Sequence, residues 1–232
     1  MKVIGILGGM SWESTQNYYQ IINQEVKRRF GGLHSAKCIV YSVDFAEIEQ
    51  LQQSGDWESS ALILSNAAQA LQLAGAELIV IATNTMHKVF DEIQKSVAIS
   101  LLHIADATAA QIKLSGINKI ALLGTCFTME QDFYKARLSD NYGIEVIVPN
   151  REERKIVHDI IYNELCKGII SENSRQYYLD LIKRLVASGA DGIILGCTEI
   201  EQLINQIDCN VPLFATARIH ALAAVDFALS DI

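Results

Sequence analysis

The sequence predicts an α/β protein made of two similar three-layer α/β/α units, each with a sheet of mostly parallel strands. Short runs rich in Val, Ile and Leu alternate with longer helical stretches along the whole chain. This alternation is typical of parallel sheets covered by helices. Two further observations support the prediction: the second half repeats segments of the first, and several of the expected strands end in polar or Gly-rich turns.

The first half of the chain supplies four expected strands and the helices between them. We interpret "KVIGILG" (2–8) as a strand, because its apolar run ends in a Gly pair and is too short for a signal-peptide core. The other strands are expected at 36–43, 77–82 and 98–102. Helices are expected at about 13–29, 58–74, 86–95 and 105–114.

The second half starts the same order again at "KIALLG" (119–124). Strands are expected there at 119–124, 144–148, 191–196 and 211–215. Helices are expected at 129–140, 152–166, 172–187, from near 198, and at 216–229.

Four pairs of segments carry the internal repeat. "GAELIVIATNT" (75–85) matches "GADGIILGCTE" (189–199) at an offset of 114 residues, and "IGILGGM" (4–10) matches "IALLGTC" (120–126) at 116. "QNYY" with "QDFY" and "ISLLHIA" with "VPLFATA" give offsets of 115 and 112. Four matches in one order at nearly one offset indicate two similar units, with a boundary near residue 102.

Composition excludes several classes of function. The formal net charge of −8 argues against nucleic acid or an anionic membrane as the main partner. No apolar run approaches the roughly 20 residues of a membrane helix. The five cysteines are odd in number and form no C-x-x-C pair, so we expect neither a zinc site nor a disulfide framework, and a reducing cytoplasm fits.

Three expected strand ends carry turns where a ligand could bind. They are Gly8-Gly9-Met10-Ser11, Thr83-Asn84-Thr85 and Cys197-Thr198-Glu199. Ligands of open parallel sheets bind beyond the carboxyl ends of the strands, and the start of a following helix favours a carboxylate. The first turn matches neither G-x-G-x-x-G nor a Walker motif, so it is either a strand-to-helix turn that needs Gly or a close approach for substrate.

The repeat aligns the other two turns residue by residue, with Thr83 opposite Cys197. Each residue alone has an ordinary explanation, since Thr83 could cap a helix and Cys197 could fill space. Their matched positions at two strand ends indicate a functional role for both. If the two units face each other across a cleft, Thr83 and Cys197 approach one ligand from opposite sides. A thiol at a helix start is expected to have its pKa lowered from about 8.5 toward neutrality. Glu199 either binds a substrate amine or lies in the first helical turn, and His87 either orients a neighbour or is a core or capping residue.

The motifs "IGILGGMSWEST", "ATNTMH" and "GCTEI" together resemble the aspartate/glutamate racemase family of cofactor-independent amino-acid racemases, most closely its YgeA-like broad-specificity branch. The resemblance covers essentially the whole chain. It implies two pseudo-symmetric domains, residues 1–102 completed by 210–232 and residues 103–209, with the active site in the interdomain cleft. It also implies a homodimer, no cofactor and no metal, and substrate contacts from Met10 and Gln52.

The same resemblance implies a catalytic pair, Thr83 and Cys197, and substrate binding by Asn84, Thr85, Thr198 and Glu199. Most of the family has cysteine at both catalytic positions, so Thr83 is a departure. The family's Arg for a side-chain carboxylate is missing, and Cys166 stands where a Lys is expected. The predicted function is two-base racemisation of aspartate, glutamate or a broader set of amino acids. The alternatives are a single-cysteine decarboxylase or isomerase of small dicarboxylates, and a non-catalytic amino-acid-binding module.

Overall fold

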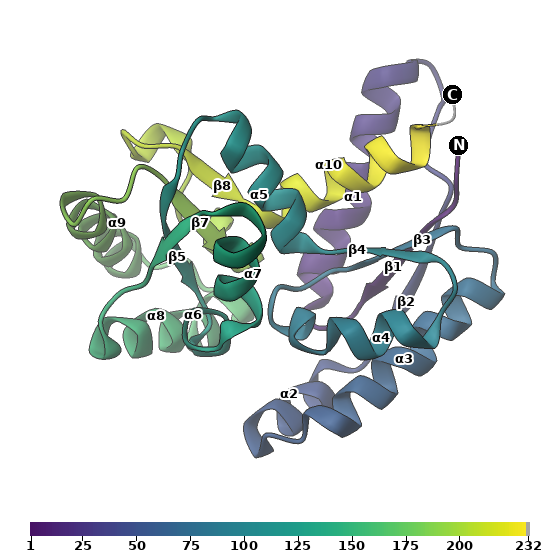
Figure 1. The fold of residues 1–232 in the computed structure, drawn as a ribbon, viewed down its shortest axis with the longest axis horizontal. Coiled ribbons are helices and arrows are strands. Elements are labelled where there is room, and N and C mark those ends of the chain that lie inside the picture. The colour runs from purple at the N-terminus through teal and green to yellow at the C-terminus, as the bar shows by residue number, and fades with distance from the viewer. Residues whose placement is uncertain (231–232) are drawn as a thin grey trace. The chain divides into compact units, whose positions relative to one another are not determined.

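The computed structural model describes residues 1–230 and divides into two compact units (Figure 1). The first unit contains Met1–Ile104 and the segment from Ala217 onward, and the second contains Ala105–Thr216. Each unit has its own four-stranded sheet, in which every pair of neighbouring strands is parallel. The predicted α/β class with two helix-covered parallel sheets is therefore confirmed.

The sheet of the first unit has the strand order β2-β1-β3-β4. Its strands are β1 (Ile4–Gly8), β2 (Cys38–Ser42), β3 (Leu78–Ile81) and β4 (Ser100–Leu102). Its helices are α1 (Trp12–Phe30), α2 (Phe45–Ser54), α3 (Trp57–Leu73), α4 (Phe90–Ser96) and the C-terminal α10 (Thr216–Leu229), with a 3₁₀ segment η1 (Thr85–Val89) after β3.

The two faces of this sheet bury different helices because successive side chains of a strand point to opposite sides. Along β3, Leu78 and Val80 pack with residues of α1 and α10. Ile79 and Ile81 pack on the other face with residues of α2, α3 and α4. Burial on both faces explains the continuous apolar runs in the sequence.

The second unit repeats this plan with the strand order β6-β5-β7-β8. Its strands are β5 (Lys119–Gly124), β6 (Glu145–Ile147), β7 (Ile193–Gly196) and β8 (Leu213–Ala215). Its helices are α5 (Ile104–Leu114), α6 (Cys126–Glu130), α7 (Asp132–Tyr142), α8 (Arg151–Asn163) and α9 (Glu172–Ala187), with 3₁₀ segments η2 (Leu165–Lys167), η3 (Thr198–Gln202) and η4 (Gln206–Asp208). Strands β3 and β7 therefore hold the same place in their sheets.

Several elements differ from the sequence prediction, most clearly α2, α6 and the segment after Cys197. Helix α2 was not expected, although the Asp44 side chain caps it by accepting from the Ala46 N–H at 3.1 Å, and Gly55 ends it in a left-handed conformation. The helix expected from near residue 198 is only the five-residue 3₁₀ segment η3, with Cys197 as its N-cap residue. In the described part of the chain, no helix is long and apolar enough to cross a membrane.

Candidate active site

The turn after β1 requires glycine for its backbone geometry. Gly9 has a positive φ of 92°, and a Cβ there would collide with the backbone of Val43. Its N–H donates to the Thr15 hydroxyl at 2.8 Å, and that hydroxyl donates in turn to the Ser11 carbonyl at 3.0 Å. These bonds fix the turn at the end of β1, so the strand-to-helix interpretation of this Gly-rich segment accounts for its sequence.

The turn after β3 lies beside the turn after β1, because the two strands are neighbours. The Ala82 N–H donates to the Leu7 carbonyl at 2.8 Å, and the Ser14 hydroxyl donates to the Ala82 carbonyl at 3.0 Å. Thr83 follows directly, and its own N–H donates to the Ile81 carbonyl at 2.9 Å. Asn84 and Thr85 are both buried.

Met10 and Gln52 both lie next to the start of η1. Met10 is buried in a cluster that includes Ile48 and Met86. Gln52 is buried on α2 and donates from its amide nitrogen to the Met86 sulfur at 3.0 Å. Because Met86 follows Thr85 directly, the bond from Gln52 connects α2 to the segment that follows Thr83.

The turn after β7 joins a thiol, a hydroxyl and a carboxylate. The Cys197 thiol donates to Glu199 Oε2 at 2.9 Å, and the Thr198 hydroxyl donates to the same oxygen at 2.7 Å. All three residues are buried, and Glu199 is only 5% exposed. One carboxylate oxygen thus accepts two hydrogen bonds, and such charge-assisted bonds are stronger than those between neutral groups.

Burial raises the pKa of the Cys197 thiol well above its usual value, and the negative charge of Glu199 raises it further. The expectation of a lowered pKa was therefore wrong. The sequence shows that Cys197 precedes a helical segment, but it does not show how deeply the sulfur is buried or that a carboxylate faces it.

Two threonines at the end of β5 lie beside this strand-end group of the second unit, and sequence reasoning missed them. Gly124 pairs with Gly196 in the parallel register, so Thr125 and Cys197 follow neighbouring strands at the same level. The Thr125 hydroxyl accepts from the Thr128 N–H at 3.3 Å and shares a hydrogen bond with the Thr128 hydroxyl at 3.2 Å. The repeat contained the signal, because it aligns "GGM" after β1 with "GTC" after β5.

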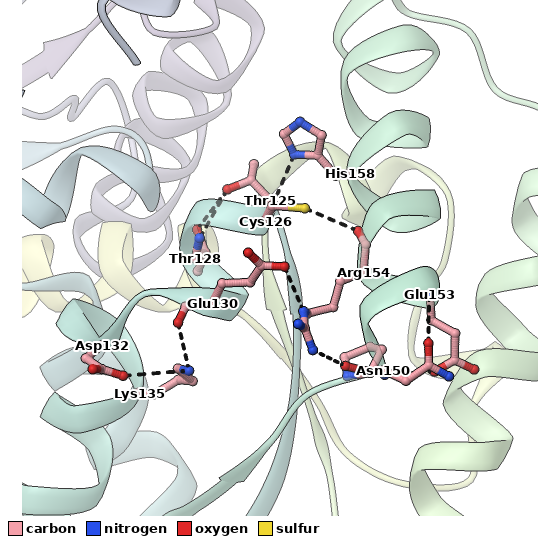
Figure 2. Close-up of polar contacts among 11 residues, drawn as sticks. Thr125, Cys126, Thr128, Glu130, Asp132, Lys135, Asn150, Glu153, Arg154 and His158 are labelled. Atoms are coloured by element: carbon pink, nitrogen blue, oxygen red, sulfur yellow. Dashed lines mark hydrogen bonds and ion pairs between the residues drawn. The ribbon is translucent and has the colours of Figure 1, made fainter. Parts of the chain in front are cut away.

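Helix α8 holds this third turn in place (Figure 2). The Cys126 N–H donates to His158 Nδ1 at 3.2 Å, and the Cys126 thiol donates to the Arg154 carbonyl at 3.6 Å. The Arg154 guanidinium also donates to Glu130 Oε1 at 2.9 Å, across the turn. Helix α8 thus contacts the segment that carries Thr125 and Thr128 at Cys126 and at Glu130.

The predicted site residues therefore form two strand-end groups, one in each unit. The first group contains Met10, Gln52, Thr83, Asn84 and Thr85, and the second contains Cys197, Thr198 and Glu199. Within residues 1–230, no three His, Cys, Asp or Glu side chains gather in a way that could hold a metal ion. Hydroxyls, a thiol and a carboxylate are groups suited to hold a small polar ligand and to move protons.

Comparison with known proteins gives the family. Residues 7–224 match the family model described as Asp/Glu/hydantoin racemase. The chain is 25% identical over 229 residues to RacX of Bacillus subtilis, a broad specificity amino-acid racemase, with 96% of each chain covered.

Two solved structures are also similar to the chain. One is a crystallised Asp/Glu racemase candidate from Yersinia pestis (61% identity, TM-score 0.93, 99% of this chain and 100% of the other). The other is an aspartate racemase homologue from Pyrococcus horikoshii (41% identity, TM-score 0.84, 98% and 99%). The family model covers far more than half of the residues, and the chain therefore belongs to the Asp/Glu/hydantoin racemase family.

Proposed function

We propose that the chain is a cofactor-independent amino-acid racemase in which Thr83 and Cys197 act on opposite faces of the substrate Cα. The observation that carries the proposal is the hydrogen bond from the Cys197 thiol to the buried carboxylate of Glu199 at 2.9 Å. Thr83 supports it from the equivalent strand end of the first unit, because β3 and β7 hold the same place in their sheets. The proposal requires both turns to contact one substrate.

Glu199 gives Cys197 a way to work as a base despite its raised pKa. The thiol passes its proton to Glu199, and the resulting thiolate removes the Cα proton of one enantiomer. In the opposite direction, with Glu199 protonated, the thiol delivers its proton to the planar carbanion, and the resulting thiolate then takes back the proton held by Glu199. General acid–base transfer of this kind contributes about 10²–10⁴-fold to rate.

Thr83 works on the other face as a weaker acid and base. Its hydroxyl delivers a proton to the carbanion, directly or through a water molecule, and recovers one in the reverse direction. The L and D forms are equally stable in achiral solution, so kcat/KM is the same in both directions. A weak acid at position 83 therefore slows both directions, and we expect a slow racemase.

The remaining polar groups of the turns hold the substrate and stabilise the developing negative charge. We assign Asn84, Thr85 and Thr198 to the substrate carboxylate and amino groups, with Met10 and Gln52 beside them. Thr125 and Thr128 add two buried hydroxyls at the level of Cys197. Donors that are already oriented act most strongly on charge that appears only in the transition state.

The substrate is proposed to be an amino acid with a small side chain that need not be charged. Cys166 lies on η2, and this segment contacts η3, which begins directly after Cys197. The group near the catalytic cysteine is thus a thiol, where a carboxylate side chain would need a cation. We therefore expect broader specificity than for aspartate alone.

The test is a substrate screen in D₂O. L-aspartate, L-glutamate, L-homoserine and other amino acids are incubated with the protein, and Cα exchange is followed by NMR together with optical rotation. Exchange with loss of rotation supports the proposal, and Cys197→Ser should abolish both. CO₂ release from a malonate, or binding without turnover that survives Cys197→Ser, would contradict it.

We further propose that the protein is a cytoplasmic homodimer. Its five cysteines are free thiols, which fits a reducing compartment. Strand β2 lies at the edge of its sheet, and its side chains Val40 and Tyr41 are 43% and 41% exposed. An exposed apolar edge of this kind favours association with a second copy. Light scattering after size exclusion should give twice the mass of the chain, and a monomer would contradict the dimer.

A further inference from the structure

Three histidines gather in the interior of the first unit, next to the turn that carries Thr83. His87, His103 and His220 are each 5% exposed or less. The ring centre of His87 lies 4.7 Å from that of His103 and 5.6 Å from that of His220. The His87 ring also stacks on Phe90, with 5.9 Å between ring centres.

The hydrogen bonds of His87 fix both its charge and its tautomer. Its Nδ1 lies 2.8 Å from the Thr83 carbonyl oxygen, which can only accept, so Nδ1 carries a hydrogen and donates. Its Nε2 accepts from the Ile104 N–H at 3.2 Å, so Nε2 carries none. The buried ring is therefore assigned as neutral, with one nitrogen directed at Thr83 and the other at the start of α5, while the Leu102 carbonyl also lies beside the ring.

A second histidine, His220, binds the end of β4, close to Ile104. His220 Nε2 lies 2.9 Å from the Leu102 carbonyl and donates to it, which leaves His220 Nδ1 to accept from the Tyr18 hydroxyl at 2.9 Å. The end of β4 is thus held at residue 102 by His220 and at residue 104 by His87.

The bond from His87 sets the direction of the Thr83–Asn84 peptide. The Thr83–Asn84 peptide is trans, so the Asn84 N–H points opposite to the Thr83 carbonyl. With the carbonyl turned inward to His87, that N–H faces away from the histidine. A hydrogen bond to the carbonyl also polarises the peptide and strengthens its N–H as a donor.

From this geometry we infer that His87 is a positioning residue for racemisation, which orients the Thr83–Asn84 peptide through its Nδ1–H. This inference rests on the proposed function, in which Thr83 moves a proton and the following residues hold the substrate. His87 itself does not contact substrate. It acts on kcat, because a displacement of about 1 Å in a catalytic group can slow a reaction by about 100-fold.

Two substitutions of His87 each remove one of its two hydrogen bonds and keep the other. The side-chain amide of Asn reaches the place of Nδ1, so His87→Asn keeps a donor for the Thr83 carbonyl and loses the bond from Ile104. The amide of Gln reaches the place of Nε2, so His87→Gln keeps an acceptor for Ile104 and loses the bond to Thr83. We expect kcat of His87→Gln to be at least 10-fold below that of His87→Asn, with KM changed less than 2-fold and similar melting temperatures.

Tyr18→Phe is the matched control, since it removes the hydroxyl bonded to His220 from the same buried cluster and leaves the His87 bonds in place. It should lower the melting temperature and leave kcat within 2-fold. Equal kcat for the two His87 variants, or an equal loss of kcat in Tyr18→Phe, would overturn the inference and reduce His87 to a core residue.

A wild-type measurement covers the case in which the variants do not fold. The ¹⁵N spectrum of His87 at pH 7 should show a hydrogen on Nδ1 and none on Nε2, and the other tautomer or an imidazolium would overturn the inference. Failure of the proposed function is distinct, since it appears as a wild-type protein that exchanges no Cα–H of any amino acid.

Discussion

Replacing Glu199 by Gln tests the central step of the proposed mechanism. The variant keeps an oxygen that can accept from Cys197, but it cannot take the thiol proton. Since general-base catalysis contributes about 10²–10⁴-fold, we expect kcat to fall by about 10²–10³-fold, or about 2.7–4.1 kcal/mol in the barrier. KM should change little, because the lost contribution is made in the transition state.

The same substitution should make the Cys197 thiol easier to ionise, although it slows racemisation. The charge of Glu199 is one of the causes that raise the pKa of Cys197, so the pKa of the thiol in Glu199→Gln should be lower than in the wild type. Alkylation by iodoacetamide, followed against pH, measures that pKa, and chiral chromatography measures racemisation. Faster alkylation together with slower racemisation is the expected result.

Glu201→Gln provides the control, because it makes the same change of charge in the same short segment η3. Its kcat should stay within about 2-fold of the wild type. If Glu199→Gln kept more than a third of the wild-type kcat, a thiolate alone would suffice, and the role given to Glu199 would be wrong.

Three further predictions concern the first unit. Thr83→Ala should abolish racemisation while slow Cα exchange of one enantiomer in D₂O survives through Cys197; full racemisation by this variant would remove Thr83 from the mechanism. Gly9→Ala should lower the free energy of unfolding by more than about 3 kcal/mol in urea titrations, because a Cβ collides with the Val43 backbone at a φ of 92°, and a loss under about 1 kcal/mol would contradict the turn geometry. Stability should also fall with acid. Burial, with the charges of His103 and His220, lowers the pKa of His87 well below 6.5, although the Thr83 and Leu102 carbonyls oppose this. The unfolded chain therefore takes up the proton first, so the stability present above about pH 6.5 is lost below it, by up to about 1.4 kcal/mol per pH unit. Urea titrations at pH 7.5 and 5 measure this loss, and His87→Asn should reduce it. An equal loss in both proteins would mean that groups other than His87 cause the acid sensitivity.

The repeat in the sequence is what made the fold predictable. Aligning "GAELIVIATNT" with "GADGIILGCTE" placed Thr83 and Cys197 on equivalent strands, and the structure has β3 and β7 in the same position of two sheets with the same strand order. Apolar runs buried on both faces also gave the strands directly. Helix α2 was missed even though Asp44 and Gly55 carry ordinary capping signals.

The chemistry of the site was less predictable, because it depends on burial and on contacts between side chains. The thiol of Cys197 has a raised pKa since it is enclosed and faces Glu199, and neither fact follows from its place before a helical segment. The role inferred for His87 depends on Ile104, which is 17 residues away in sequence. The prediction that Glu199 binds a substrate amine stays a prediction, beside its observed bonds to Cys197 and Thr198.

Helix α10 has a consequence for how the protein is made. Its residues Ala217, Ala221 and Val225 complete the apolar cluster that covers Ile4 and Ile6, so one face of the first sheet closes only after the whole second unit has been synthesised. The second unit is a single continuous segment and can fold while synthesis continues. The usual order of N-terminal domain first is thus reversed, and the half that carries Thr83 becomes native only after translation has reached α10.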